Sequence, residues 1–372
     1  MRILVKGSNQ MRIRADKQIP LLVKGLSSRD IKISSLDLRI KNGRIISSVN
    51  NQSQDWSTLT KNSSIRIMSS DPRGIWLGKR RYRGELRIAI KGQRLIAINH
   101  LGIERYLMSV VGSEMPKDWP IAALKAQAVA ARTYALKRLG SKGLFDINSS
   151  ESSQVYLGIE SETESTRSAV NSTRSLVLRY RGKLITAVFH SSSGGKTEAS
   201  GSVWKYQLPY LVSVKDFDQH SPKFRWRTKV FPSELRKAFS EIGGLNSIQI
   251  LKTSKTGRIL STKAYGPKGK IILSGIDIRR RLGLKSTLAR FEMVPYSKVS
   301  KFSNKNSTIF EKDNNQLLVP NPPQNYYLLV KGKGAGHGVG MSQWGANGLA
   351  EKGSNFRQIL LHYYSGVKIR TY

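Results

Sequence analysis

The chain has 372 residues, of which 39% are apolar and 8% aromatic, so it can form a core and is not globally disordered. Its 63 Lys and Arg against 24 Asp and Glu give a formal net charge of +39, which indicates either a polyanionic partner or a solvated basic surface. The absence of cysteine excludes disulfides, thiolate catalysis and zinc sites built on cysteine.

Residues 1–84 predict a β-rich N-terminal segment. Apolar residues partly alternate in RILVKG (2–7), IPLLVKG (19–25), SLDLRIKNGRIIS (35–47) and SSIRIMSS (63–70), and glycines interrupt them. The same pattern continues in GELRIAIKGQRLIAIN (84–99), which predicts a hairpin around Lys91-Gly92-Gln93.

No targeting segment or membrane span is visible. The first residues contain no apolar signal-peptide core, and no stretch approaches 18 apolar residues. Either the protein is cytoplasmic, or its export signal lies upstream of this chain or has been removed.

The segment PIAALKAQAVAARTYALKRLG (120–140) predicts the clearest helix in the chain. Pro120 suits the first helical position and Gly140 follows the end. The many alanines indicate a helix that packs against neighbours on several sides.

The second half of the chain predicts a mixture of strands and short helices. Two strands flank Arg181-Gly182 in SLVLRYRGKLITAVFHSSSGG (175–195), helices are expected in 232–243, 274–286 and 354–366, and a final strand in 367–372. The polar, proline-bearing stretch 303–325 predicts a long surface loop. We therefore expect an α+β fold, with mostly antiparallel strands around a buried alanine-rich helix, divided into residues 1–84 and 85–372.

Residues 332–353, GKGAGHGVGMSQWGANGLAEKG, are unusually rich in glycine. The segment lacks the GxxxxGK[ST] spacing of a phosphate loop, and the polar residues after GAGHGVG do not fit a dinucleotide-binding unit. The five histidines show no metal-binding spacing, so we expect no metal and no cofactor.

The alternation of Gly334, Gly336, Gly338 and Gly340 supports a steric interpretation. In an extended run these glycines leave one face without side chains, beside His337, Gln343 and Trp344. Such a wall suits a polyhydroxylated ligand such as a sugar. The alternative is a glycine-rich turn that lets two helices pack.

Glu114, in SEMPKDWP, is a candidate general acid. Neighbouring apolar residues would raise its pKa by desolvation, whereas a nearby helix N-terminus would favour the ionised form. The alternative is an acid that only caps the alanine-rich helix.

Arg132 lies inside the alanine-rich helix and needs an acceptor there. A buried guanidinium without a partner is costly, and Glu114 is a plausible partner. A purely structural ion pair remains the alternative.

Four separated stretches together resemble the stage II sporulation protein D (SpoIID/LytB) family. They are LGIERYLMSVVGSEMPKDWPIAALKAQAVAARTYAL (101–136), SSQVYLG (152–158), FHSSSGGKTE (189–198) and GAGHGVGMSQWGANGLAEKG (334–353), in the family's order. The resemblance covers roughly residues 85–372, and residues 209–330 match more loosely.

The resemblance implies action on peptidoglycan. Sporulation members are lytic transglycosylases that cleave glycan strands already stripped of peptides, and LytB-type members are described as enhancers of cell-wall amidases. The catalytic glutamate of the family falls on Glu114 and its required arginine on Arg132. The zinc-binding cysteines of some relatives are missing, although His190 is present.

The leading hypothesis is thus a peptidoglycan lytic transglycosylase in the periplasm or cell wall. A glycan-binding enhancer of an amidase is the alternative, and nucleic-acid binding through the basic surface has no supporting motif. The candidate substrate-binding residues are Gln127, Gln154, Tyr156, Ser192, His337, Gln343 and Trp344.

Overall fold

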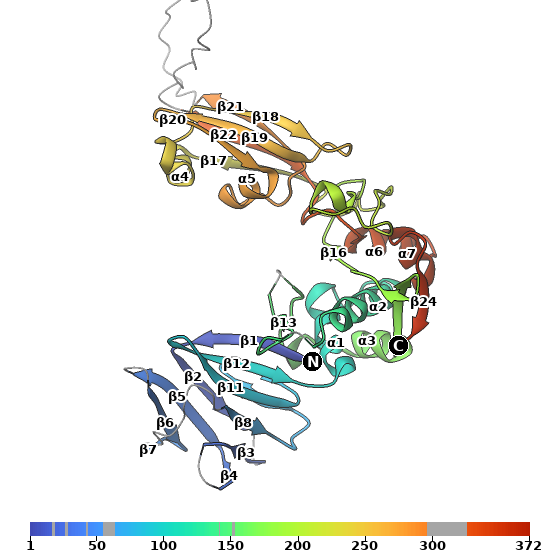
Figure 1. Cartoon of the computed structure of the whole chain (residues 1–372). Coiled ribbons are helices and arrows are strands. Elements are labelled where there is room, and N and C mark those ends of the chain that lie inside the picture. Colours follow the sequence, from blue (N-terminus) through green and yellow to red (C-terminus); the bar gives the residue numbers. More distant parts are fainter. Residues whose placement is uncertain are drawn as a thin grey trace, which may run out of the picture. The chain divides into compact units, whose positions relative to one another are not determined.

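The computed structural model describes residues 1–16, 19–26, 29–41, 44–54, 64–140, 142–150, 153–295 and 326–372. The loop predicted at 303–325 lies outside these residues. The chain forms two compact units (Figure 1). The first unit comprises residues 1–188, 349–362 and 366–372, and the second comprises residues 189–348 and 363–365.

Two β-sheets form the N-terminal part of the first unit. The seven-stranded sheet has the order β13-β1-β12-β11-β8-β3-β4, and the six-stranded sheet has the order β10-β9-β2-β5-β6-β7. The strands in chain order are β1 (Arg2–Ser8), β2 (Gln10–Arg14), β3 (Leu21–Lys24), β4 (Ile31–Ile33), β5 (Ser35–Lys41), β6 (Arg44–Val49), β7 (Gln52–Gln54), β8 (Ile65–Met68), β9 (Ile75–Leu77), β10 (Arg80–Tyr82), β11 (Glu85–Lys91), β12 (Arg94–His100) and β13 (Ile147–Asn148).

The alternation seen in the sequence is present in these strands. In β2, β3 and β8 every second side chain is buried, because one face of each sheet covers the core. The predicted hairpin is confirmed, since Lys91 in β11 pairs with Arg94 in β12. Strand β1 pairs with β12, so the boundary expected at residue 84 crosses the seven-stranded sheet.

Three α-helices follow these sheets: α1 (Ile103–Glu114), α2 (Ile121–Lys137) and α3 (Glu164–Ser172), with the short 3-10 helix η1 (Ile159–Ser161) before α3. The helix expected in 120–140 is confirmed as α2, and its residues from Ala123 to Ala135 are buried apart from Lys125. Alanines permit this burial on several sides because they occupy little space. Helices α1 and α3 were not predicted.

A three-stranded sheet completes the first unit. Its order is β15 (Lys183–Leu184), β14 (Leu176–Tyr180), β24 (Lys368–Thr371). Both strands predicted around Arg181-Gly182 and the final strand are confirmed. Helix α7 (Phe356–Tyr363), also predicted, leads into β24.

The second unit contains two further three-stranded antiparallel sheets around a core that includes Trp226, Phe239 and Leu328. One sheet consists of β17 (Arg225–Val230), β22 (Tyr326–Lys333) and β21 (Ala289–Pro295), and the other of β18 (Ser247–Thr253), β19 (Ile259–Gly266) and β20 (Gly269–Ser274). The predicted helices are confirmed as α4 (Pro232–Ala238), followed by η3 (Ser240–Ile242), and α5 (Gly275–Arg281).

The remainder of the second unit is rich in loops. Strand β16 (Phe189–His190) pairs in parallel with β23 (Met341–Ser342), η2 (Ser200–Ser202) follows, and α6 (Gln343–Glu351) begins directly after β23. The predicted α+β class with mostly antiparallel strands is confirmed. Across the described part of the chain, no helix combines the length and apolar character needed to cross a membrane.

Candidate functional site

Glu114 is the last residue of α1, and its side chain is half-buried. Its Oε1 accepts a hydrogen bond of 2.8 Å from the backbone N–H of Val155. The sequence interpretation placed this acid at the N-terminus of the following helix, which was wrong. At the C-terminus of α1 the helix dipole disfavours the ionised carboxylate, while the Val155 N–H favours it.

Two buried side chains fix the segment that carries Val155. Gln154 accepts from the Tyr106 hydroxyl at 2.9 Å and donates to the Ala131 carbonyl in α2 at 3.2 Å. The Tyr156 hydroxyl donates to Asn99 Oδ1 at 2.7 Å. Gln154 and Tyr156, predicted to contact substrate, are 0% and 2% exposed, so they hold the Val155 backbone rather than line a surface.

The Tyr106 phenol lies between α1 and this segment. Burial, and after it the charge of Glu114, raise the pKa of Tyr106 well above its ordinary value. The hydroxyl therefore remains a proton donor to Gln154 at all physiological pH values.

Arg132 in α2 is fully buried and pairs with Glu104 in the first turn of α1. Its Nε and Nη2 donate to the two Glu104 carboxylate oxygens at 3.0 and 2.6 Å, and two further bonds reach the carbonyls of Val170 and Leu176. The pairing expected with Glu114 was wrong. Arg132 instead ties α2 to the helix whose far end carries Glu114.

Gln127, five residues before Arg132 in α2, is also completely buried. Neither its amide nitrogen nor its amide oxygen finds a hydrogen-bond partner among the described residues. Two unpaired polar atoms in the interior are costly. A polar ligand group beside this face of α2 would lower that cost.

In the second unit, two serines of the HSSSGG stretch, Ser192 and Ser193, are buried and bonded to two aspartates. Ser192 donates to Asp218 and Ser193 donates to Asp216. Burial, and then the charge of Asp218, raise the pKa of Asp216. Ser192 is 0% exposed, so the predicted substrate contact is here a structural hydrogen bond.

The glycine run does not form the extended wall that its alternation suggested. Gly334, Gly336, Gly338 and Gly340 all have φ between 70° and 102°, which is left-handed rather than extended backbone. A Cβ at Gly338 would lie 2.5 Å from the guanidinium carbon of Arg258, which is 1% exposed. The glycines thus make room for a buried arginine.

Arg258 holds this part of the second unit together. Its Nη2 donates to the Ser193 carbonyl at 2.6 Å, linking the strand β19 region to the HSSSGG stretch. Burial lowers the pKa of Arg258 to about 10, so it is still charged at neutral pH.

His337 lies within a row of three aromatic rings. Its ring centroid is 5.4 Å from that of His190 and 5.3 Å from that of Trp204, and its Nδ1 accepts from the Val339 N–H. Burial, and then the positive charges of Arg258 and Arg279, lower the pKa of His337 to about 4. The imidazole is therefore neutral at physiological pH.

Sequence reasoning missed Trp204 and Tyr206, which are 39% and 67% exposed. Lys205 Nζ lies 5.3 Å from the Tyr206 ring centroid. Trp204, an exposed aromatic side chain next to His337, offers the flat apolar surface on which sugars stack. The WKY triplet in the sequence carries the signal, although nothing local distinguishes it from a core segment.

The remaining predicted residues begin α6. Gln343 is 6% exposed, and the Trp344 ring lies edge-on to His220 at 5.4 Å between centroids. The backbone N–H of Trp344 donates to the Ser191 carbonyl at 3.0 Å, which joins α6 to the HSSSGG stretch.

The predicted site residues thus divide between the two units. Glu114, Arg132, Gln127, Gln154 and Tyr156 belong to the first unit. The second unit contains Ser192, His337, Gln343 and Trp344. Among the described residues, no three His, Asp or Glu side chains gather in an arrangement that could hold a metal ion.

Comparison with known proteins supports the resemblance drawn from the motifs. The family model described as stage II sporulation protein matches residues 91–180, which include Glu114 and Arg132. The chain is 32% identical over 293 residues to stage II sporulation protein D of Bacillus amyloliquefaciens, covering 73% of this chain and 75% of that protein.

Two further relatives are similar over comparable lengths. An uncharacterized protein of Brachyspira hyodysenteriae is 33% identical over 303 residues, covering 80% of this chain and 75% of that protein. A Bacillus subtilis protein named amidase enhancer is 30% identical over 295 residues, covering 72% of this chain but 40% of the relative.

Proposed function

The chain belongs to the stage II sporulation protein D family, and from that premise we propose that it is a peptidoglycan lytic transglycosylase. Its substrate would be glycan strands from which the peptides have been removed, and its products would carry 1,6-anhydro-muramoyl ends. It would act outside the cytoplasm, in the periplasm or the cell wall.

The placement of Glu114 carries this proposal. Glu114 is a half-buried carboxylate at the C-terminus of α1, held by the N–H of Val155. The helix terminus disfavours the carboxylate and the Val155 N–H favours it, so the two effects on the ionised form oppose each other. A group that must give and then take a proton needs both forms.

One carboxyl group suffices for the proposed reaction. Protonated Glu114 gives its proton to the glycosidic oxygen as the bond from C1 breaks. The resulting carboxylate then removes the proton from the muramoyl C6 hydroxyl, whose oxygen bonds to C1. The acid is thereby regenerated, no water is consumed, and the second carboxylate used by most glycoside hydrolases is not required.

Arg132 would act as a positioning residue. It binds both Glu104 oxygens from the interior of α2, and Glu104 and Glu114 lie in the first and last turns of the same helix. Fixing α1 in this way fixes the start of the Glu114 side chain. The buried side chains of Gln154 and Tyr156 would position Val155, whose backbone N–H donates to Glu114.

Substrate contacts would come from groups that the structure leaves accessible or unsatisfied. In the first unit the unpaired amide of Gln127 is completely buried, so it would support such contacts only from the interior. In the second unit Trp204 would stack on a sugar ring beside His337 and Trp344 would extend this surface, while Gln343 and Ser192 would support it from the interior.

A peptide-stripped strand is also an anionic substrate. Hydrolysis of the amide between the muramoyl lactyl group and the peptide leaves one free carboxylate on each stripped muramoyl residue. A protein with a net charge of +39 attracts such a strand more strongly than a neutral one.

The alternative function is a glycan-binding enhancer of a cell-wall amidase. The relative named amidase enhancer favours it, and the buried Arg132–Glu104 pair would serve a non-catalytic fold equally well. Under this alternative the amidase would be a partner, and Glu114 would only bind the glycan.

Incubation with defined, peptide-stripped glycan strands, followed by mass spectrometry of the ends, distinguishes the two functions. We expect anhydro-muramoyl ends with the wild type and none with Glu114→Gln. The glutamine oxygen still accepts from the Val155 N–H, so this variant removes the acid and keeps the hydrogen bond.

Glu104→Gln, on the same helix, is the matched control. It leaves Arg132 with a buried, incompletely neutralised charge and should lower the melting temperature, whereas Glu114→Gln should not. Wild-type protein that forms no anhydro ends but stimulates an amidase would support the enhancer, and full cleavage by Glu114→Gln would refute the mechanism.

A further inference from the structure

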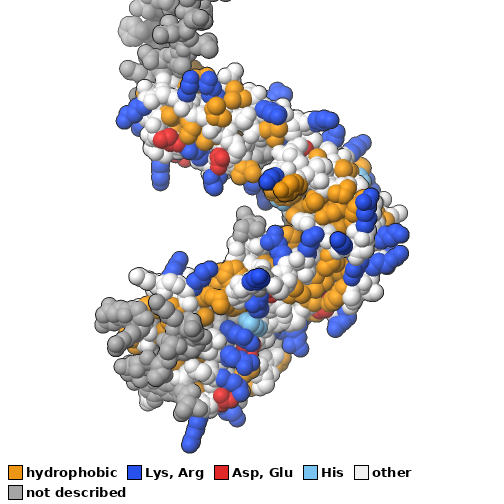
Figure 2. All heavy atoms as spheres, in the orientation of Figure 1, with side chains coloured by type: hydrophobic (Ala, Val, Ile, Leu, Met, Phe, Trp, Pro, Cys, Tyr) orange, Lys and Arg blue, Asp and Glu red, His pale blue; other side chains and the backbone are white. Residues whose placement is uncertain are grey.

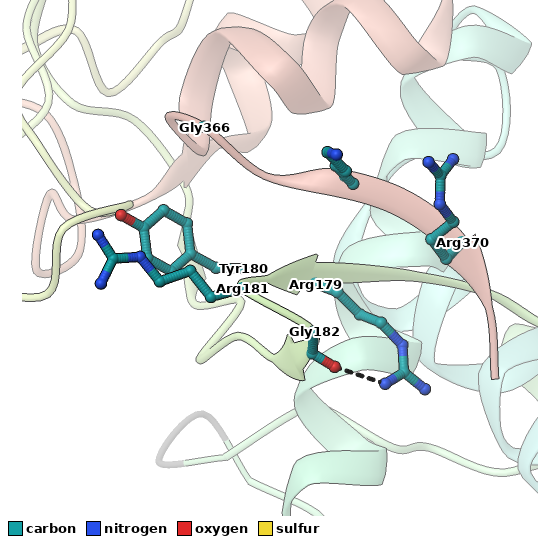
Figure 3. A pocket seen from close by; sticks show the side chains of 7 residues that line it. Arg179, Tyr180, Arg181, Gly182, Gly366 and Arg370 are labelled. Carbon is teal, nitrogen blue, oxygen red and sulfur yellow. Dashed lines mark hydrogen bonds between the residues drawn. The ribbon is translucent and has the colours of Figure 1, made fainter.

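A basic pocket lies in the first unit between β14 and β24. It has a volume of 390 Å³ and is lined by Arg179, Tyr180, Arg181, Gly182, Gly366, Lys368 and Arg370 (Figure 3). Arg179 and Tyr180 end β14, Arg181-Gly182 forms the turn to β15, and Lys368 and Arg370 lie on β24. This volume lies within the range of small-molecule sites.

The charges of this β14–β24 pocket are not neutralised by the protein. Its lining contains four cationic side chains and no acid, and none of the salt bridges among the described residues includes them. Arg179 lies directly opposite Lys368 in the antiparallel ladder. Like charges in that position repel, so the arrangement weakens the sheet unless an anion lies between them.

The turn at Arg181-Gly182 has an unfavourable backbone conformation beside the same pocket. Arg181 has φ of 48° and Gly182 has φ of 78°, the conformation of a type I′ hairpin turn. The first position of such a turn prefers Asn, Asp or Gly, and arginine is unfavourable there. The sequence therefore places a guanidinium at the mouth of the pocket where the backbone would prefer another residue.

The pocket also contains an aromatic surface. The guanidinium carbon of Arg181 is 5.5 Å from the centroid of the Tyr180 ring. A planar ring beside guanidinium groups suits a ligand that joins a sugar face to an oxyanion, because guanidinium binds carboxylates in bidentate fashion and the ring supplies apolar contact.

We infer that the β14–β24 pocket binds the free lactyl carboxylate of a peptide-stripped muramoyl residue, and so selects stripped over peptide-bearing strands. This inference rests on the proposed function for its substrate. The pocket contacts no residue assigned to the chemistry, and it therefore acts as a specificity site. A strand that retains its peptide carries an amide at this position and offers no carboxylate next to the sugar.

The inference is tested by measuring the affinity of the protein for size-defined stripped strands. The same measurement is made on these strands after their carboxylates have been converted to methylamides. The measurements use Glu114→Gln protein so that cleavage cannot alter the ligand. We expect the Lys368→Gln/Arg370→Gln pair to lose about fivefold in affinity for the charged strand, as two exposed charge contacts would give, and to bind the amidated strand unchanged.

Lys252→Gln/Lys270→Gln is the matched control, since it removes the same charge from exposed positions on β18 and β20. It should leave the affinity for both strands unchanged. Arg181→Asn is a second test that does not depend on tolerance of the fold. Asparagine suits the left-handed position, so stability should rise while affinity for the charged strand falls.

Equal affinity of the pocket variant and its control for the charged strand would overturn the inference. So would competition by poly(glycerol phosphate) or duplex DNA as effective as competition by the stripped strand, because the pocket would then be a general anion site. If the wild type does not cleave glycan but the carboxylate-dependent binding is observed, the enzymatic proposal fails and the pocket assignment stands.

Discussion

Gly334 shows how a motif residue can be essential without touching a ligand. Its φ is 70°, and a Cβ there would lie 2.6 Å from the Ser192 carbonyl oxygen. The backbone of the HSSSGG stretch thus lies so close to Gly334 that no Cβ fits between them. Spacing in the sequence argued against a phosphate loop, yet it could not show what fills the space that the glycines leave.

We predict that Gly334→Ala destabilises the protein by roughly 2–5 kcal/mol, from the left-handed backbone and from the clash with the Ser192 carbonyl. Gly283→Ala is the control, because Gly283 has φ of 60° but nothing within 4 Å of a Cβ. It should cost only about 1–2 kcal/mol. Urea unfolding measures both, and equal costs would contradict the packing role given to Gly334.

Helix α1 is the element on which the sequence interpretation and the structure differ most. Helix α2 could be predicted because Pro120 and Gly140 bound an alanine-rich run, and both bounds are local signals. Helix α1 contains Gly112, a poor helix former, whose missing side chain admits the Ser161 carbonyl at a distance no Cβ would allow. That reason is tertiary, so the local pattern could not reveal it.

The partner of Arg132 could not be predicted for a similar reason. The need for an acid was clear from a buried arginine, but Glu104 and Glu114 are both close in the sequence and only the packing of α1 on α2 chooses between them. Glu114 itself was proposed first from its apolar neighbours and then from the motif resemblance, whereas its Val155 contact spans 41 residues.

At the level of these two helices we predict that Arg132→Met costs about 3–5 kcal/mol, because it leaves Glu104 without its buried partner. Adding Glu104→Leu should recover part of that loss, since no unpaired carboxylate remains. The recovery is incomplete because Arg132 also donates to the carbonyls of Val170 and Leu176. A double-mutant cycle by chemical denaturation measures the coupling.

The cycle also separates positioning from direct catalysis. A positioning role predicts that the cleavage rates of Glu104→Gln and Arg132→Lys fall together, in proportion to their loss of stability. Arg132→Lys with a far lower rate than an equally stable Glu104→Gln would contradict that role and place the arginine at the substrate.

At the scale of the whole molecule the net charge of +39 is the dominant property. Lys and Arg side chains are scattered over the whole visible face, and Asp and Glu side chains are few (Figure 2). Such a field acts over a Debye length and accelerates encounter with any polyanion, whatever the local contact. Local sites such as the β14–β24 pocket then decide which polyanion stays bound.

These two contributions should separate in the kinetics of binding to stripped glycan strands. Raising the salt from about 0.01 M to about 1 M shortens the Debye length from about 30 Å to about 3 Å, so the association rate should fall by on the order of tenfold to a hundredfold. Lys368→Gln/Arg370→Gln and Lys252→Gln/Lys270→Gln each remove two charges from the same +39, so they should lower that rate slightly and equally. Only the pocket pair should speed dissociation, because only it removes contacts made in the bound state. Biolayer interferometry on immobilised strands measures both rates, and a salt-independent association rate would show that the basic surface does not steer this substrate.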